Sequence, residues 1–244
     1  MQVEAFAVRL RPRTPLEAAD LGVRLCQSTA RSVYPCYGIV ALPVMVLALA
    51  SFEIASWLPA LLIWCAKPWL DRTILFVLSR AAFGQRTTVA DVWRAQRQVW
   101  WGQFLFTWTI QRLSLWRAIA QPVYQLEGLS IWRARARVRQ IRHRNTGSAM
   151  MMTHAFSVSE TALTFALISL AFWFAPSGRS PMGLEVLSGE LPVFLLVTFP
   201  VAYAMAVLFL EPFYVGAGFA IYLNRRAELE AWDIEQEFRR AFSR

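Results

Sequence analysis

Long apolar runs alternate along this chain with short, strongly basic segments. Residues 155–175 and 191–210 are each long enough to cross a bilayer, and the second run carries no charged residue. A third run, residues 38–56, contains Pro43 and has Glu53 near its end. At about 1.5 Å per residue this run extends roughly 28 Å, close to the thickness of the hydrocarbon layer. The pattern predicts membrane-spanning helices.

A fourth run, residues 57–79, is interrupted by charged residues. About ten residues precede Lys67-Pro68, and they cover only about 15 Å, half of the hydrocarbon layer. Either the helix kinks at Pro68 and carries Lys67, Asp71 and Arg72 into the bilayer, or the hairpin is shallow. We interpret residues 57–79 as a fourth span, so the predicted fold is an all-α integral membrane protein with four transmembrane helices.

The basic residues predict the orientation of these spans. Four spans place residues 51–58 and 176–190 on one side of the membrane, and Arg179 is the one basic residue there. The other 24 of the 25 lysines and arginines lie on the opposite side or at its membrane boundary. Cytoplasmic segments carry such an excess. We therefore expect a multi-pass membrane protein with both termini in the cytoplasm.

The segments between the spans have the composition of helices at the cytoplasmic surface. Thr14-Pro15-Leu16-Glu17 predicts a helix start, with threonine as N-cap and proline at the first helical position. Tryptophans spread over residues 91–128 predict interfacial helices, and Gln121-Pro122 predicts a helix end. Residues 130–145 contain six arginines, which we expect to contact anionic lipid head groups: Arg133, Arg135, Arg137, Arg139, Arg142 and Arg144.

Two stretches of the chain resemble each other. Glu211-Pro212, followed by Leu223-Asn224-Arg225, matches Lys67-Pro68, followed by Leu78-Ser79-Arg80. This similarity predicts two duplicated hairpin units, residues 1–128 and 129–244, related by an axis along the membrane normal. The alternative is a chance likeness of two amphipathic segments.

Charged residues within the apolar runs are the candidate site. Isolated charges are costly in a bilayer, so they usually pair with one another or line a wet cavity. We predict a polar cluster between the two units, formed by Lys67, Asp71, Arg72, Glu160 and Glu211. In the alternative, Lys67 and Glu211 reach to the cytoplasmic interface as anchors at helix ends.

The C-terminal segment, residues 222–242, is predicted to form a solvated helix in which Arg226 and Glu230 pair at i,i+4 spacing. Its candidate positions for docking a partner protein are Arg225, Arg226, Trp232 and Phe238. Gly216 and Gly218, just before this segment, indicate close helix packing and form no dinucleotide fingerprint.

The motifs of common catalytic sites are missing from the sequence. The two histidines, His143 and His154, are not in a metal-binding spacing, and the sequence has no nucleophile elbow or phosphate-binding loop. We therefore expect a protein that is not an enzyme, without cofactor or metal. A net charge of +9 could suggest nucleic acid, but a 57% hydrophobic chain with basic segments beside its spans indicates a membrane protein that binds no nucleic acid.

The stretch from Glu211-Pro212-Phe213-Tyr214-Val215 through Tyr222-Leu223-Asn224-Arg225-Arg226 to Trp232-Asp233-Ile234-Glu235 resembles a family of uncharacterised bacterial inner-membrane proteins. The family is more distantly similar to the membrane domain of some glycerophosphodiester phosphodiesterases. Its members tend to be encoded beside MoxR-type AAA+ ATPases, and this resemblance implies a subunit of a multi-component envelope system.

The expected function is accordingly that of a non-enzymatic membrane subunit or scaffold, which binds anionic lipid and partner proteins through its cytoplasmic face. A MoxR-type ATPase is one such partner implied by the resemblance. The alternative is a small transporter or channel, which predicts a water-accessible cavity at Lys67, Asp71, Arg72 and Glu211. A lipid-modifying enzyme would need a convergent acid/base pair, which the sequence does not indicate.

Overall fold

The computed structural model describes residues 13–101, 114, 116–143, 145–174 and 193–230, and this part of the chain is helical without any strand. Its helices are α1 (Pro15–Ser28), α2 (Ala30–Ala50), a 3₁₀ turn (Ser51–Glu53), α3 (Leu58–Ala81), α4 (Val89–Arg94), a π-helical turn (Arg97–Trp101), α6 (Arg117–Leu126), α7 (Ile131–Arg142), α8 (Thr146–Trp173) and α9 (Val193–Glu230). The predicted all-α class is confirmed.

Among the residues that the structure describes, three segments are long and apolar enough to cross a membrane: Ala30–Glu53, Thr146–Trp173 and Leu195–Glu230. Large apolar side chains such as Leu47 on α2 and Phe165 on α8 point outward, away from the core. Extended apolar surface of this kind is compatible with a protein embedded in lipid. Helix α3 has 24 residues and a similar length, but Lys67, Asp71 and Arg72 within it make it less apolar than the other three.

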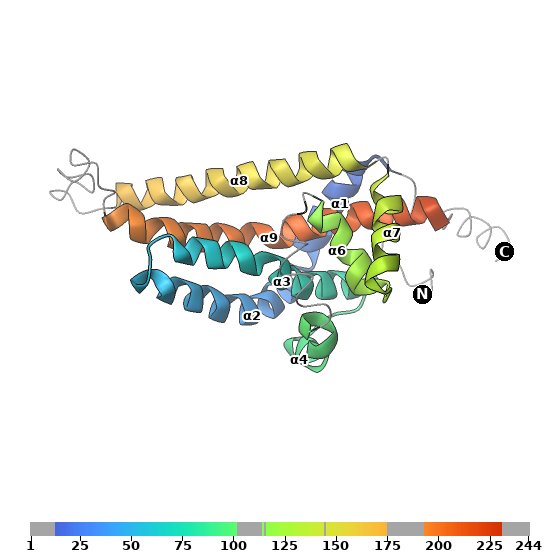
Figure 1. The fold of residues 1–244 in the computed structure, drawn as a ribbon, viewed down its shortest axis with the longest axis horizontal. Helices are drawn as coiled ribbons and strands as arrows, with labels where there is room; N and C mark the ends of the chain where they lie inside the picture. The colour runs from blue at the N-terminus through green and yellow to red at the C-terminus, as the bar shows by residue number, and fades with distance from the viewer. Residues whose placement is uncertain (1–12, 102–113, 115, 144, 175–192, 231–244) are drawn as a thin grey trace.

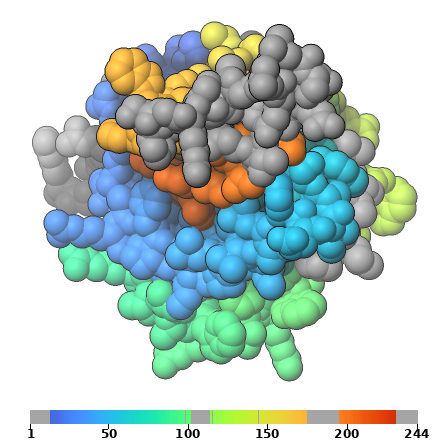
Figure 2. Space-filling model, turned by 90° about the vertical axis from the view of Figure 1, so that its left-hand side faces the viewer, coloured from blue at the N-terminus to red at the C-terminus, as the bar shows by residue number. Residues whose placement is uncertain are grey.

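The long helices lie side by side (Figure 1). Helix α2 packs against α3, α8 packs against α9, and α9 also contacts α3 and α1. The turn between α2 and α3 lies at one end of the bundle, while α6, α7 and the carboxyl end of α9 lie at the other. Viewed from the first end, α2 and α3 lie next to each other, and the chain around α4 projects to one side (Figure 2).

Helix α1 starts where the sequence predicts. Thr14 accepts a hydrogen bond from the Glu17 amide, and the Glu17 carboxylate accepts one from the Thr14 amide, which completes a capping box. The chain just before this cap is held by Asn224 of α9. The Asn224 amide donates to the Arg13 carbonyl at 2.9 Å and its oxygen accepts from the Arg13 amide at 3.0 Å.

Prolines do not end helices here, contrary to the helix end predicted at Gln121-Pro122. Pro122 lies inside α6, and α9 continues as a helix through Pro212, beyond the apolar run of residues 191–210. A helical proline removes one hydrogen bond and bends the helix. The cost is tolerated where neighbouring groups satisfy the freed backbone. Near Pro212 the Tyr34 hydroxyl donates to the Phe209 carbonyl at 3.0 Å.

Glycines allow α9 to approach two other helices, as the sequence indicates for Gly216 and Gly218. A Cβ on Gly22 of α1 would lie 2.1 Å from the Gly216 carbonyl oxygen, and a Cβ on Gly218 would lie 2.2 Å from the Cβ of Ala118 in α6. Since no side chain fits such distances, α1 and α6 pack backbone to backbone on α9. This contact brings the first residue of α6 into the core.

Candidate functional site

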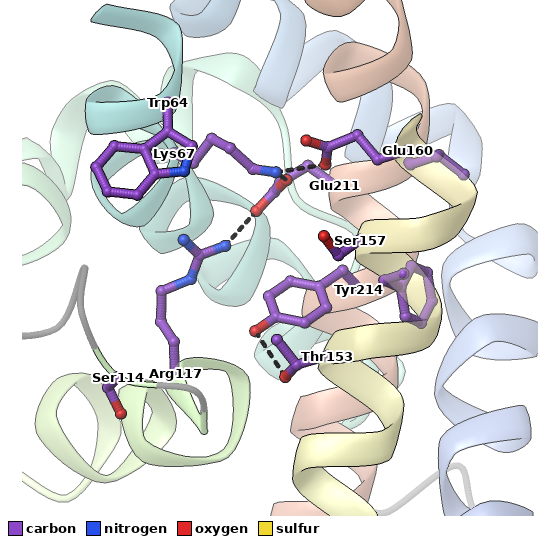
Figure 3. Close-up of a pocket in the computed structure, with 11 residues that line it drawn as sticks. Trp64, Lys67, Ser114, Arg117, Thr153, Ser157, Glu160, Glu211 and Tyr214 are labelled. Atoms are coloured by element: carbon purple, nitrogen blue, oxygen red, sulfur yellow. Dashed lines mark hydrogen bonds and ion pairs between the residues drawn. The ribbon is translucent and has the colours of Figure 1, made fainter. Parts of the chain in front are cut away.

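Five charged side chains from four helices form a continuous network, which we call the charge cluster. Figure 3 shows four of them, Lys67, Arg117, Glu160 and Glu211. Lys67 Nζ lies 2.5 Å from Glu160 Oε2 and 2.8 Å from Glu211 Oε2. Arg117 Nη2 lies 2.6 Å from Glu211 Oε1, and Arg117 Nε lies 3.1 Å from Asp71 Oδ2. The order of contacts is therefore Glu160, Lys67, Glu211, Arg117 and Asp71.

The fold places these groups by helix register. Lys67 and Asp71 are four residues apart on α3, so both point to the same side of the helix. Glu211 faces them from the middle of α9, and Glu160 reaches Lys67 from α8. Apart from Glu160, each side chain of the charge cluster is buried, with Asp71 completely inaccessible to solvent.

Four of the five residues predicted to form a polar cluster are thus brought together: Lys67, Asp71, Glu160 and Glu211. The structure gives the fifth predicted residue, Arg72, a contact outside the charge cluster. It follows Asp71 and so points about 100° away around the helix, where its Nε donates to the Val99 carbonyl at 2.5 Å. Arg72 therefore ties α3 to the π-helical turn.

Arg117, which the sequence reading did not select, is the second cation of the charge cluster. It belongs to a row of polar residues spaced four apart on α6. Gln121 donates to the Pro68 carbonyl at 3.1 Å and Gln125 donates to the Arg72 carbonyl at 2.8 Å. The i,i+4 spacing in Arg-x-x-x-Gln-x-x-x-Gln indicates one polar face of a helix. A predicted helix end at Gln121-Pro122 separates Arg117 from Gln125, so the sequence analysis does not recognise this face.

A cavity of about 240 Å³ adjoins the charge cluster. Lys67, Arg117, Glu160 and Glu211 all line it, whereas Asp71 and Arg72 do not. Its other walls combine hydroxyl and apolar groups, namely Trp64, Ser114, Thr153, Phe156, Ser157, Leu210 and Tyr214. Thr153 and Tyr214 face each other across α8 and α9, with their hydroxyl oxygens 3.4 Å apart (Figure 3).

Charges buried in this way stabilise a fold only when each has a partner. Removing one member of a buried pair typically costs roughly 3–5 kcal/mol, because the remaining charge stays dehydrated. Glu211 contacts both cations, and Lys67 contacts two carboxylates. Three carboxylates face two cations, so with every group ionised the charge cluster would carry one net negative charge.

A second network lies at the end of the bundle where α6, α7 and α9 meet. Tyr222 donates to Glu127 at 2.8 Å, and Arg137 pairs with both Glu127 and Glu230. Arg226 pairs with Glu230 at 3.0 Å, which confirms the predicted i,i+4 pair. Arg137 and Arg226, predicted to contact lipid and a partner, thus belong largely to contacts within the chain.

The other predicted lipid and partner residues divide into three groups. Arg133, Arg135 and Arg139 are exposed on α7. Arg142 lies over the Trp116 ring at 4.3 Å, and Arg225 pairs with Glu228 at 2.6 Å. Arg144, Trp232 and Phe238 lie outside the described residues.

Within the described part of the chain, His, Cys, Asp and Glu side chains form no group suited to a metal ion. Comparison of the chain with protein-family models, with curated proteins and with solved structures finds no match. The charge cluster, the cavity and the arrangement of the helices are therefore the features that bear on function.

Proposed function

We propose that this is an integral membrane protein that binds a small polar solute at the charge cluster, as a transporter or channel does. The observation that carries the proposal is the cavity, whose wall holds two cations and two carboxylates of the cluster. Charged groups that line a cavity between apolar helices are typical of solute or ion pathways. Since both signs of charge face the cavity, the fitting solutes are small ions or zwitterions.

The proposal includes α3 as a fourth span in the bacterial inner membrane. At 24 residues, α3 would extend about 36 Å, enough to cross the hydrocarbon layer. Lys67, Asp71 and Arg72 are turned into the protein, while Leu61 and Leu62 are exposed on its outer side. A charged helix can lie in lipid when its charges face inward in this way.

The proposed orientation of the protein in the membrane is based on where its basic residues lie. The turn between α2 and α3 contains no lysine or arginine, whereas the opposite end holds the arginines of α7 together with Arg225 and Arg226. The positive-inside rule therefore favours placing α7 in the cytoplasm.

A duplicated origin for the two hairpins is also part of the proposal. The pairs α2–α3 and α8–α9 each join two long neighbouring helices, and each second helix carries a charged residue followed by proline. Lys67 and Glu211 then occupy equivalent places in the two units, and their 2.8 Å ion pair joins the units across the repeat axis.

Water access to the cavity tests the solute-binding function. In a Cys65→Ala background, where Cys26 and Cys36 are buried, single cysteines replace Ser157, which lines the cavity, and Ser159, which is exposed on another side of α8. A hydrophilic thiol reagent is expected to label the Ser157→Cys variant in membranes at least tenfold faster than the Ser159→Cys variant. Equal, slow labelling of both would show a dry interior and contradict the proposal.

A scaffold function is the second candidate, favoured by the outer face of α7. Arg133, Arg135 and Arg139 are exposed there, beside Trp132, which is 78% exposed. Basic residues with a tryptophan fit anionic head groups or an acidic partner surface at the cytoplasmic face. The resemblance to inner-membrane proteins encoded beside MoxR-type ATPases makes such an ATPase the partner to look for. Affinity purification in mild detergent tests this, and recovery of the chain alone would count against it.

A further inference from the structure

We infer that the charge cluster contains a proton-binding site, with the proton held on Asp71 and shared with Glu211. The inference concerns the resting protein and stands whether or not the cavity admits a solute. It begins with the charges, since Asp71, Glu160 and Glu211 face only Lys67 and Arg117 in this network. One net negative charge in a dehydrated interior is costly, and binding one proton removes it.

Contacts of the three carboxyl groups show where the proton belongs. Glu211 contacts both cations, with Arg117 Nη2 at 2.6 Å from its Oε1 and Lys67 Nζ at 2.8 Å from its Oε2. Glu160 receives Lys67 at 2.5 Å and is partly open to the cavity. Asp71 is fully buried, and neither of its oxygens accepts a hydrogen bond, since the nearby Arg117 Nε is not aligned to donate. A buried carboxylate without donors is the least favourable of the three, so the proton resides there.

Glu211 is the acceptor for this proton. Asp71 and Glu211 contact the same guanidinium, Asp71 through Oδ2 and Glu211 through Oε1. A protonated Asp71 then donates to a carboxylate that is already held by two cations. Because Glu211 lines the cavity and Asp71 does not, Glu211 is also the route by which the proton exchanges with the cavity.

The titratable groups near Asp71 lie on α2, α3, α6, α8 and α9. These are Arg117 of α6, Glu211 of α9, Lys67 of α3 itself, Glu160 of α8 beyond Lys67, and Tyr37 of α2, whose buried hydroxyl has no hydrogen-bond partner. Arg72 follows Asp71 but directs its Nε to the Val99 carbonyl. No second ion pair to Asp71 exists among the described residues, so Arg117 is its one cationic contact.

Infrared spectroscopy of the purified full-length protein at neutral pH tests the inference directly. A protonated carboxyl group gives a C=O stretching band that is separate from the carboxylate bands and shifts in heavy water. We expect one such band, its complete loss in Asp71→Asn, and its retention in the surface control Glu228→Gln. Absence of the band, its retention in Asp71→Asn, or its loss in Glu228→Gln would each overturn the inference.

A second comparison covers the case in which Asp71→Asn does not fold. Asp71→Glu keeps an ionisable carboxyl on a longer side chain, so the band should persist at a shifted frequency. A band unmoved by Asp71→Glu would overturn the inference. These readouts are independent of thiol labelling in the cavity, so a dry cavity with the band present would reject the solute-binding function and leave the proton site in place.

Discussion

Lys67 Nζ lies 2.8 Å from Glu211 Oε2, and each of these residues stands directly before a proline inside a long helix. Their ion pair joins α3 to α9 at the centre of the bundle, and Glu160 and Arg117 extend it to α8 and α6. The charge cluster therefore connects four helices that lie far apart in the sequence, and its integrity can be tested one residue at a time.

Neutralising Lys67 should destabilise the protein strongly. Lys67→Met leaves Glu160 and Glu211 without a shared cation, and the loss of a buried partner costs roughly 3–5 kcal/mol. Thermal unfolding in detergent measures the effect. In a double-mutant cycle with Glu211→Gln, the combined loss should be smaller than the sum of the two single losses, whereas additive losses would show that the pair is not coupled.

Exchanging the two charges should not restore stability, even though Lys67 and Glu211 pair directly. In the variant with Lys67→Glu and Glu211→Lys, the new glutamate lies beside Glu160 and the new lysine lies beside Arg117. Two like-charge contacts replace two attractive ones. We expect the double reversal to remain as unstable as either single reversal, and a melting temperature equal to that of the wild type would contradict the network.

Arg117 should not be replaceable by lysine. Its Nε and Nη2 contact Asp71 and Glu211 separately, and an ammonium group cannot reproduce this planar two-sided contact. Arg117→Lys and Arg117→Gln should therefore both lower the melting temperature, with the second change costing several kcal/mol. The exposed Arg94 on α4 gives a matched control, since Arg94→Gln should have no measurable effect. Equal melting temperatures for the Arg117 and Arg94 variants would refute this role.

Adding one methyl group at Gly22 or Gly218 should separate helices that now touch. The new Cβ would lie 2.1 Å from the Gly216 carbonyl oxygen or 2.2 Å from Ala118 Cβ. Overpacking of this kind typically costs about 1–3 kcal/mol, against a gain of up to about 1 kcal/mol in helix propensity. Gly38 on α2 has open space around its Cα, so Gly38→Ala should be neutral or stabilising in the same melting assay.

The thiol of Cys26 should resist alkylation at alkaline pH. Burial between α1 and its neighbours raises the pKa of Cys26 from 9.0 to about 12. Between these values the unfolded chain ionises the thiol while the folded chain keeps it protonated, so this residue favours unfolding as the pH rises through that window. Maleimide labelling is carried out at pH 8 and at pH 10, and the modified residues are identified by mass spectrometry. Cys26 should be modified only after denaturation. Labelling of native protein at pH 10 would contradict the packing of α1.

Much of the fold could be predicted from the sequence because it follows from local patterns. Apolar length predicts α2, α8 and α9, and the cap at Thr14 predicts the start of α1. The continuation of α6 through Pro122 could not be predicted in the same way. It depends on tertiary contacts, such as the approach of Ala118 to Gly218, which offset the local cost of the proline.

Only part of the charge cluster could be predicted from the sequence, because some of its residues stand out locally and others are defined only by packing. A charge in an apolar run is unusual by itself, so Lys67, Glu160 and Glu211 stand out in the sequence. Arg117 lies in a mixed, tryptophan-rich stretch where an arginine is unremarkable, and only its packing against α9 makes it a buried cation. The direction of Arg72 likewise depends on Val99, which the sequence does not relate to it.

The sidedness of two cysteines in intact cells tests most directly whether the charge cluster lies within a membrane. In the Cys65→Ala background, one cysteine replaces Ile54, which is 80% exposed in the turn before α3, and another replaces the exposed Gln140 of α7. If α3 crosses the membrane, an impermeant thiol reagent labels the Ile54→Cys variant from outside and labels Gln140→Cys only after lysis. If only α2, α8 and α9 cross, both positions lie on the same side, and equal labelling of the two in intact cells would contradict the account.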